Sequence, residues 1–314
     1  MKQAVLKEFE QYKARIKSAL ASEQSMLEEV VANLLVPSGK QMRPLLVLLT
    51  AKLHGEVNEK SYAAAMLFEM LHWATLIHDD VVDEAYMRRG ELTLGAMMRS
   101  KSAVLVGDFL FTRGLAVAAR AENYQAITSA TRCIEMVVDG ELMQSRNAAR
   151  LTTTREDYYE IIKLKTAVVL ASCAQVGAAS VGATEKQVES MYRLGELLGC
   201  AFQIQDDILD LTDTNTGKTK YNDLQERKIT LPLIFAMEKE GRSEALKQLR
   251  RAAHSQKSIN WLIAFIKRNE GIEKARKELN DKHREAMEII RSYPESAVRE
   301  SLIKFADYVV LRKK

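Results

Sequence analysis

Residues 68–90 read FEMLHWATLIHDDVVDEAYMRRG. Apolar side chains recur in this stretch at three- and four-residue spacing, which is the period of an α-helix with one buried face. We expect a single helix over Lys60–Asp83, whose last turn carries Asp79, Asp80 and Asp83. Two adjacent arginines follow in the next few residues. So much charge of both signs behind an apolar helix predicts that a bound group completes the electrostatics.

The rest of the chain has the same helical period. Only four prolines and fourteen glycines interrupt its 314 residues, and alternation of period two is hard to find. We predict helices with the following approximate bounds: Lys2–Ala21, Gln24–Leu35, Met42–Leu53, Lys60–Asp83, Ala103–Ala119, Tyr124–Ala149, Arg155–Val181, Glu185–Leu211, Thr230–Lys239, Ser243–Ala253, Ser258–Asn269, Gly271–Ser292 and Glu295–Arg312. No linker, low-complexity tract or repeat of roughly 20–50 residues divides the chain. The sequence therefore predicts an all-α protein with one domain over residues 1–314.

The composition excludes several classes of function. Apolar residues make up 47% of the chain, which suffices for a large buried core. The net charge is only +4 and aromatic residues make up 6%, so we expect no nucleic-acid partner. Cys133, Cys173 and Cys200 have no CxxC spacing, which argues against a zinc site or a disulfide framework and favours a reducing compartment.

Two stretches bear on targeting and membranes. Residues 1–20, MKQAVLKEFEQYKARIKSAL, carry charge throughout and have no apolar core of a signal peptide. The longest run without charge, Thr166–Thr184, is long enough to raise the question of a membrane span. It is rich in Ala, Ser and Gly and contains Gln175, which favours a tightly packed internal helix. We expect a cytoplasmic protein that does not span a membrane.

The acidic cluster that ends the first helix has the pattern DDxxD. Residues three and four apart share a helix face, so all three carboxylates can project to one side within about 5–6 Å of each other. Carboxylates that close repel one another unless a cation lies among them, and Mg²⁺ suits such a set because it binds carboxylates together with substrate phosphates. The competing interpretation is a solvated helix end with a chance acidic run, and this cluster alone does not decide between them.

A second cluster repeats the pattern. Residues 203–210 read QIQDDILD and place Asp206, Asp207 and Asp210 at the same spacing on another predicted helix. Like the first cluster, it follows an apolar run and precedes basic residues. Two helices that each present three aspartates can face each other across a cavity and hold a diphosphate through bridging Mg²⁺. The repetition makes a chance origin improbable.

Over nearly its whole length, the sequence resembles the trans-prenyltransferases, the isoprenyl (polyprenyl) diphosphate synthases. The stretches that carry the resemblance are SGKQMRP (38–44), residues 68–90, VGDFLF (106–111), GELMQ (140–144), KTA (165–167), FQIQDDILD (202–210) and GKTKYNDLQERKITLP (217–232). Two aspartate motifs in this order, with RRG after the first and a KT pair between them, form a highly specific combination. The implied fold is the isoprenoid synthase type I fold, an all-α bundle around a central active-site cavity. Such enzymes are usually homodimers, and the apolar face of 103–119 is a plausible contact.

The resemblance implies a Mg²⁺-dependent condensation. An allylic diphosphate loses its diphosphate, the alkene of isopentenyl diphosphate attacks the allyl cation, and a proton leaves. Stabilising the charge of the leaving group is then the main catalytic contribution. By resemblance, Asp79, Asp83 and Asp206 are the metal ligands, with three ions present when substrate is bound. The supporting aspartates are Asp80, Asp207 and Asp210.

The same resemblance assigns two diphosphate sites. The residues implied for the allylic diphosphate are Arg88, Lys165, Thr166, Gln203, Lys218 and Lys228. The residues implied for isopentenyl diphosphate are Lys40, Arg43, His72 and Arg89. His72 lies two helical turns before Asp79 on the same face, although spacing alone fits a structural histidine as well. His78 matches no role and is interpreted as structural.

Product length is expected to depend on the helix that precedes the first aspartate motif. Ala74 and Thr75, one turn before Asp79, are small, whereas bulky residues at these positions form a floor in this family. Leu71 and then Phe68 follow further down, roughly 16 Å from Asp79 at the α-helical rise. We therefore expect a product of roughly six to nine isoprene units, used for quinone side chains. The alternative is that the small residues only permit helix packing and that the product is farnesyl or geranylgeranyl diphosphate.

Some positions depart from the family pattern. Ser38, Tyr221 and Arg227 stand where glycine is usual, and Gln41 replaces a common basic residue. These changes concern loop geometry and isopentenyl diphosphate binding, whereas the metal ligands are complete. A class I terpene cyclase and a non-catalytic helical subunit remain alternatives. The cyclase normally mixes Asn, Ser and Glu in its second metal motif, and the subunit loses aspartates.

Overall fold

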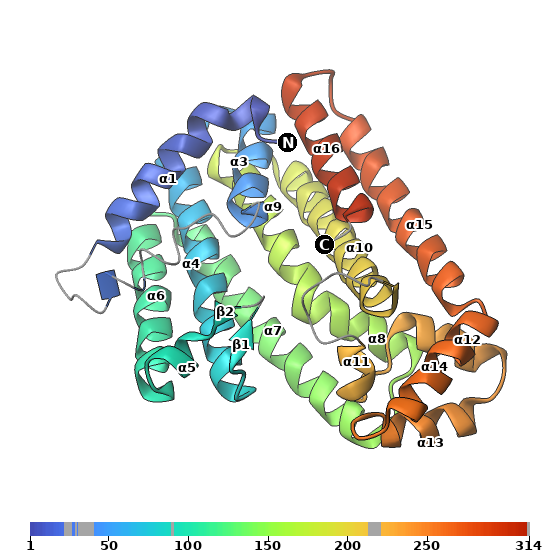
Figure 1. Ribbon diagram of the computed structural model, residues 1–314. Coiled ribbons are helices and arrows are strands. Elements are labelled where there is room, and N and C mark those ends of the chain that lie inside the picture. The colour runs from blue at the N-terminus through green and yellow to red at the C-terminus, as the bar shows by residue number, and fades with distance from the viewer. Residues whose placement is uncertain (22–26, 29, 31–40, 89–90, 213–220, 313–314) are drawn as a thin grey trace. The chain divides into compact units, whose positions relative to one another are not determined.

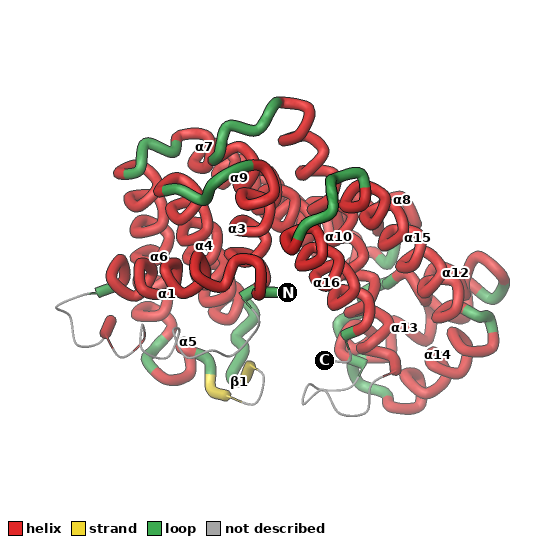
Figure 2. The backbone as a smooth tube through the Cα atoms, turned by 90° about the horizontal axis from the view of Figure 1, so that it is seen from above, coloured by secondary structure: helices red, strands yellow, loops and turns green. Residues whose placement is uncertain are grey.

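The structure is a computed structural model and describes residues 1–21, 27–28, 30, 41–88, 91–212 and 221–312. Its elements, labelled in Figure 1, are η1 (Gln3–Val5), α1 (Leu6–Leu20), α3 (Met42–His54), α4 (Glu59–Val82), β1 (Met87–Arg88), β2 (Glu91–Leu92), α5 (Leu94–Met97), α6 (Ser100–Arg120), α7 (Tyr124–Arg150), α8 (Arg155–Ile162), η2 (Lys163–Ala167), α9 (Val168–Ser180), α10 (Glu185–Thr212), α11 (Asn222–Gln225), α12 (Leu231–Lys239), α13 (Arg242–Ala252), α14 (Gln256–Arg268), α15 (Gly271–Arg291) and α16 (Ala297–Leu311). The expected all-α class is confirmed. The two short strands form one antiparallel hairpin, yellow in Figure 2.

The chain forms two compact units, and each unit draws on three separate stretches. The first unit comprises Met1–Arg132, Leu170–Arg193 and Pro294–Leu302. The second unit comprises Cys133–Val169, Leu194–Tyr293 and Ile303–Lys314. Helices α7, α9, α10 and α16 contribute residues to both units. A single domain over residues 1–314 stays a prediction.

Helix α4 is the centre of the first unit. Its start is fixed by a capping box, in which Asn58 accepts from the main chain of Ser61 and the Ser61 side chain accepts from that of Asn58. Most of its residues are buried, and it runs beside α6 (Figure 1). Gly114 of α6 allows this approach, because a Cβ there would lie 3.2 Å from Leu67 Cδ1 and 3.4 Å from Met70 Cβ. The unit thus holds the first aspartate motif on a rigid, buried helix.

In the second unit, α12 packs against α8, α14 and α15. Pro232 lies in the first turn of α12, where its missing N–H costs no hydrogen bond. Residues 231–237 of this helix are all buried. Gly271, which begins α15, faces the Pro232 carbonyl so closely that a Cβ would lie 2.1 Å from the oxygen.

The predicted helices match the observed ones with three differences. The helix expected over Arg155–Val181 contains a π-helical segment, η2, between α8 and α9. The short helices α5 and α11 were not predicted, because four residues give no periodic signal. The helix expected over Gln24–Leu35 falls largely outside the described residues.

Candidate active site

The first aspartate motif lies in the last turn of α4, in the first unit. Asp79 and Asp83 are exposed, whereas Asp80 is buried at 8% exposure. The main-chain N–H of Asp83 donates to the Asp79 carbonyl over 2.8 Å, which closes the helix. Asp80 therefore differs from the other two in exposure, and a common side for all three carboxylates stays a prediction. The outer two aspartates remain accessible to a ligand.

The second aspartate motif lies on α10, in the second unit, and it also combines a buried aspartate with a more exposed one. Asp207 is 2% exposed, and both of its oxygens accept hydrogen bonds, from Tyr158 Oη over 2.6 Å and from Gln203 Nε2 over 3.0 Å. Asp206 has a side chain that is 40% exposed. Asp210 accepts from the main-chain N–H groups of residues 222 and 223 over 3.1 Å and 3.3 Å, at the start of α11. Asp207 is thus buried, and each of its oxygens already accepts a hydrogen bond within the fold.

Burial and the nearby Asp223 raise the pKa of Asp207 well above its usual range. Burial, followed by the charge of Asp207, also raises the pKa of Tyr158 well above its usual range. Both effects have one cause, which is that each group is excluded from water and faces negative charge.

Each of the two aspartate motifs offers donors of a kind that suits a hard divalent cation. Asp79, Asp83 and Asp206 offer carboxylate oxygens that are at least partly exposed. Within the described ranges, no three His, Cys, Asp or Glu side chains converge to enclose an ion by themselves. Mg²⁺ is usually bound by one or two carboxylates together with substrate phosphates, so the exposed carboxylates suit an ion that the diphosphate completes. Their role as ligands stays a prediction.

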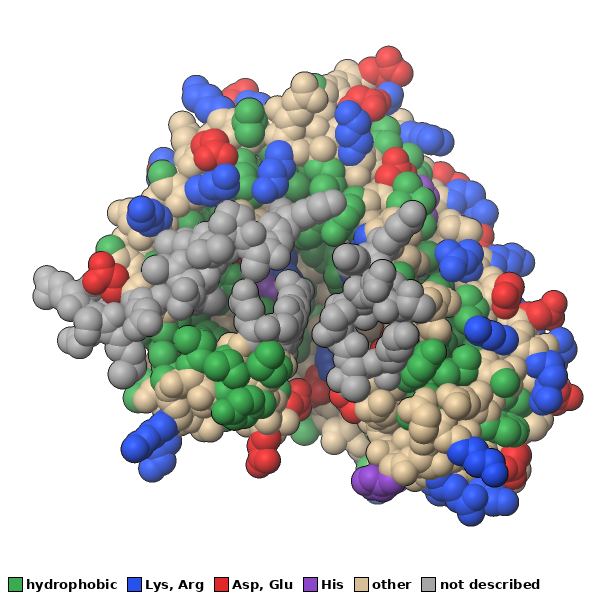
Figure 3. Space-filling model, viewed as in Figure 1, with side chains coloured by type: hydrophobic (Ala, Val, Ile, Leu, Met, Phe, Trp, Pro, Cys, Tyr) green, Lys and Arg blue, Asp and Glu red, His purple; other side chains and the backbone are tan. Residues whose placement is uncertain are grey.

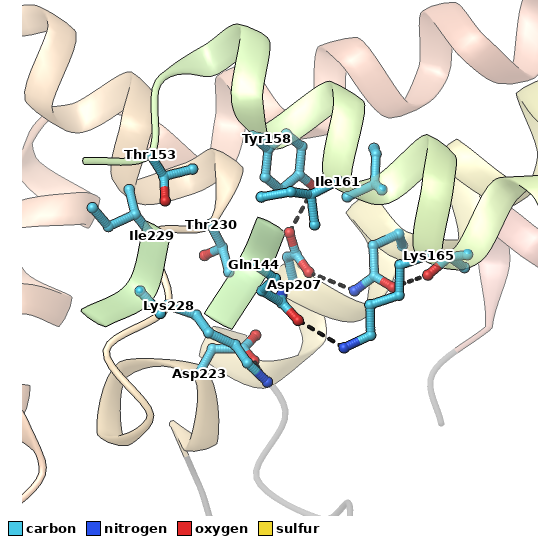
Figure 4. A pocket seen from close by; sticks show the side chains of 14 residues that line it. Gln144, Thr153, Tyr158, Ile161, Lys165, Asp207, Asp223, Lys228, Ile229 and Thr230 are labelled. Atoms are coloured by element: carbon cyan, nitrogen blue, oxygen red, sulfur yellow. Dashed lines mark hydrogen bonds and ion pairs between the residues drawn. The ribbon is translucent and has the colours of Figure 1, made fainter. Parts of the chain in front are cut away.

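A cavity of about 90 Å³ opens in the second unit beside the second motif (Figure 4). Four of the six residues predicted for the allylic diphosphate line it: Lys165, Thr166, Gln203 and Lys228. Thr166 Oγ1 donates to Gln203 Oε1 over 2.9 Å, and Gln203 donates onward to Asp207. The side chains of the other two, Arg88 and Lys218, lie outside the described residues. The cavity therefore combines cations with the buried aspartate network.

Lys165 reaches the cavity from the π-helical segment η2 (Lys163–Ala167). Its ammonium group donates to Gln144 Oε1 over 2.7 Å and pairs with Glu141 over 2.5 Å. Two glycines contact this segment closely. A Cβ on Gly140 would lie 2.9 Å from the main-chain nitrogen of Lys165, and a Cβ on Gly199 would lie 2.3 Å from the Ala167 Cα. Segments of π-helix within α-helices frequently occur at functional sites, and here the segment sets the positions of Lys165 and Thr166.

The second cation of the cavity, Lys228, is held by two carboxylates. It lies 3.9 Å from Asp223 and also pairs with Glu226. Burial alone would lower the pKa of Lys228, but these two carboxylates raise it above its usual value. Two residues of this loop, Tyr221 and Arg227, have left-handed backbones with φ of 61° and 59°. These are positions where the sequence departs from a family glycine, so the backbone keeps a conformation that glycine would adopt without strain.

Two of the four residues predicted for isopentenyl diphosphate are described, both in the first unit. Arg43 lies in the first turn of α3 and His72 on α4, and both are partly exposed. Lys40 and Arg89 lie outside the described residues. One turn before His72, Glu69 is buried at 4% exposure, and its Oε2 has no hydrogen-bond partner among the described residues. Burial raises the pKa of Glu69 to about 7, although the charges of Arg43 and Lys2 oppose the shift.

The residues expected to line the product tunnel lie on α4. Phe68, Leu71 and Ala74 are buried, at 2%, 5% and 1% exposure, and Thr75 is partly exposed. The Thr75 hydroxyl donates to the His72 carbonyl over 3.0 Å, which leaves its methyl group on the surface of the helix. His78, interpreted as structural, packs its ring against Gly107 of α6, where a Cβ would lie 2.2 Å from Nε2. Gly107 belongs to VGDFLF, which explains this glycine by packing.

The sequence did not point to three residues of these sites: Tyr158, Glu69 and Arg312. Arg312 follows α16 and forms an ion pair with Asp206 over 2.8 Å. A lone glutamate in the apolar run FEML was a signal for Glu69. Tyr158 and Arg312 carried no local signal, because their partners lie 49 and 106 residues away along the chain.

Comparison with known proteins identifies the family. The model of a protein family described as polyprenyl synthetase matches residues 24–266. The chain belongs to the polyprenyl synthetase family. It is therefore a prenyltransferase, and the resemblance found in the sequence is confirmed.

Individual members of the polyprenyl synthetase family align along most of the chain. Octaprenyl diphosphate synthase of Haemophilus influenzae is 33% identical over 85% of this chain and 83% of its own. Heptaprenyl diphosphate synthase component 2 of Geobacillus stearothermophilus is 33% identical over 94% and 92%. The crystal structure of a decaprenyl diphosphate synthase from Rhodobacter capsulatus has a TM-score of 0.92 at 32% identity, covering 100% of this chain and 98% of that chain. The fold is thus the all-α isoprenoid synthase fold.

Proposed function

We propose that this polyprenyl synthetase makes an all-trans polyprenyl diphosphate by adding isopentenyl diphosphate, head to tail, to an allylic diphosphate such as farnesyl diphosphate. The product has roughly six to nine isoprene units, as judged from the length of α4 available before Phe68 obstructs. Relatives named for heptaprenyl, octaprenyl and nonaprenyl products support this length. The downstream use is in quinone side chains.

The observation that carries the proposal is the linked set of polar groups in the cavity of the second unit (Figure 4). Thr166, Gln203 and Asp207 form one hydrogen-bonded chain, and Lys165 and Lys228 bring two cations to the same cavity. These cations bind and orient the allylic diphosphate and stabilise charge that grows as it departs. Asp79, Asp83 and Asp206 would hold Mg²⁺, which when bound neutralises further charge on the leaving diphosphate.

The second substrate binds through cations without metal. Arg43, with Lys40 and Arg89, supplies the positive charge, and His72 supplies a ring nitrogen on the Asp79 side of α4. The elongating chain then extends along α4 past Thr75, where buried apolar side chains exclude water. No protein side chain is assigned as the base, and the released diphosphate takes the proton.

We infer further that the enzyme is a cytoplasmic homodimer. Exposed large apolar side chains support an interface, and Figure 3 shows apolar side chains gathered over the region of α5 and the β1–β2 hairpin. The exposed residues there and at the start of α6 are Met87, Leu92, Met97, Val104 and Leu105. A group of exposed apolar side chains of this kind is typical of a protein–protein contact. Light scattering measures the mass of the assembly and so tests for a dimer. Because one relative is named component 2 of its enzyme, the activity of this chain is also measured without any other subunit.

In the part of the chain that the structure describes, two helical stretches have the length and apolar composition of a membrane span, Ser100–Arg120 and Arg155–Ser180. In their most apolar windows, 33% and 67% of the residues are buried. The second stretch contains Lys165, and its burial supports a core helix. For the first, coverage by a second subunit accounts for the exposed apolar side chains without a bilayer.

One experiment tests the proposed reaction. Purified protein is incubated with labelled isopentenyl diphosphate and Mg²⁺, with geranyl, farnesyl or geranylgeranyl diphosphate in turn as primer. The products are dephosphorylated and sized. Condensation to a long chain is expected. Absence of condensation with every primer rejects the function, whereas a product that stops at farnesyl or geranylgeranyl diphosphate rejects only the chain length.

A further inference from the structure

We infer that Arg312 is a positioning residue that fixes the carboxylate of Asp206 for metal binding. The inference rests on the proposed function, in which Asp206 is a metal ligand. Arg312 directly follows α16, and its Nη2 lies 2.8 Å from Asp206 Oδ1. Both residues belong to the second unit.

Arg312 is anchored by groups other than Asp206. Its Nη2 donates to the Phe202 carbonyl over 2.8 Å, and its guanidinium carbon lies 3.6 Å from the centroid of the Phe202 ring. Both main-chain polar groups of Arg312 are hydrogen-bonded. Its N–H donates to the Tyr308 carbonyl, and its carbonyl accepts from Gln205 Nε2 over 3.0 Å. Phe202, Gln205 and Asp206 lie within about one turn of α10. The cation is therefore held against the same turn that carries its carboxylate partner.

The two partners differ in exposure. The Arg312 side chain is 7% exposed and that of Asp206 is 40% exposed, so the carboxylate extends from a buried cation toward solvent. A carboxylate has about four acceptor positions, and the ion pair uses one oxygen. The other oxygen remains for an ion, while the hydrogen bond limits rotation of the side chain. Groups that orient a metal ligand in this way typically contribute about 10–100-fold to metal affinity or activity.

A competing role for the ion pair is that Arg312 substitutes for the metal and leaves when the ion binds. The two roles predict opposite effects, because removing a competing cation would strengthen metal binding. The anchoring favours positioning. A departing guanidinium would leave the Phe202 ring and carbonyl, and its Nε already lacks a hydrogen-bond partner among the described residues. Burying more unpaired donors costs free energy, so the arginine stays in place.

The test measures binding of Mn²⁺, added alone to the full chain as a substitute for Mg²⁺, by electron paramagnetic resonance of the free ion. Arg312→Met should weaken binding by about 10-fold or more. Arg312→Lys keeps the charge but not the planar group, and should lose a smaller part. Arg299→Met is the matched control, because Arg299 lies on α16, the helix that Arg312 directly follows, and pairs with Glu295 instead. It should leave Mn²⁺ affinity unchanged.

A double-variant cycle with Asp206→Asn separates positioning from general loosening of the fold. If Arg312 acts through Asp206, then Arg312→Met has no further effect on Mn²⁺ binding in the Asp206→Asn protein. Unchanged or tighter binding by the folded Arg312→Met protein overturns the inference, and so does an undiminished effect in the double variant. Where Arg312→Met does not fold, Arg312→Lys decides by the same criteria. If Asp206→Asn itself leaves Mn²⁺ binding unchanged, the metal site of the proposed function fails, which is a separate result.

Discussion

Two residues in the loop beside the cavity carry backbone strain. Tyr221 and Arg227 have positive φ, a region that costs non-glycine residues roughly 1–2 kcal/mol each. Arg227 precedes Lys228, so its backbone sets the direction of a cation in the proposed allylic site. The strain therefore lies where it holds a functional side chain in place.

Arg227→Gly should stabilise the protein by about 1 kcal/mol, because glycine adopts positive φ without the clash of a Cβ. Urea unfolding with a fluorescence or circular-dichroism readout measures the change. Arg227→Ala is the matched control, since it removes the same side chain but keeps the Cβ, and it should gain little. Equal gains from both variants would assign the effect to the arginine side chain rather than to the backbone.

Glu69 gives the protein a pH-dependent stability. Its pKa is raised to about 7 in the fold, so folding favours its neutral form. This contribution is fully present below the ordinary glutamate pKa and is lost as pH rises through about 7, a change of roughly 3 kcal/mol. Glu69→Gln should therefore be more stable than the parent protein at pH 8 and lose that advantage at pH 4. Unfolding free energies of both proteins at the two pH values measure this, and a difference independent of pH would contradict it.

Among elements, the π-helical segment η2 shows what sequence period cannot reveal. Residues 155–181 have one continuous run of helical residues, and nothing in that run marks the π-helical turn at Lys163–Ala167. Two remote glycines, Gly140 on α7 and Gly199 on α10, lie against this segment. By contrast, the bounds predicted for α4, Lys60–Asp83, differ from the observed Glu59–Val82 by one residue at each end, because its apolar spacing is long and regular.

Gly199→Ala should displace η2, because the new Cβ would lie 2.3 Å from the Ala167 Cα. Overpacking of this kind costs about 1–3 kcal/mol, and the shift of Thr166 should raise the KM for the allylic substrate. Thermal unfolding and steady-state kinetics measure the two effects. Gly95→Ala is the control, since its Cβ would meet its nearest atom at 3.5 Å, an ordinary contact. Unchanged stability and KM in Gly199→Ala would show that the segment does not depend on this glycine.

The two aspartate motifs could be found in the sequence because both have the same spacing. The surroundings of the individual aspartates within each motif could be predicted only in part. The helical period placed Asp79 and Asp83 four residues apart on one side, and both are exposed. It did not show that both oxygens of Asp207 accept hydrogen bonds within the fold, because one donor, Tyr158, comes from another helix. Spacing therefore predicts which face a side chain shares, and only the fold supplies its partners.

At the scale of the whole molecule, product length tests the proposed path of the chain along α4. Thr75→Phe places a ring one turn before Asp79 and should shorten the product by several isoprene units. Sizing of the dephosphorylated products measures this. Val82→Phe is the control, because Val82 lies on the same helix at 81% exposure and should leave the length unchanged. Full-length product from Thr75→Phe would mean that the chain does not pass this residue.

The interleaved composition of the two units has a consequence during synthesis. The first unit uses residues 294–302 and the second uses residues 303–312, so both lack segments while the ribosome is still translating most of the chain. The contacts that Arg312 makes with Phe202, Gln205 and Asp206 of α10 must wait for this late segment. Incomplete intermediates with exposed apolar surface are prone to aggregate. We therefore expect overexpression to depend on chaperone supply more strongly than for a protein whose units are contiguous in sequence.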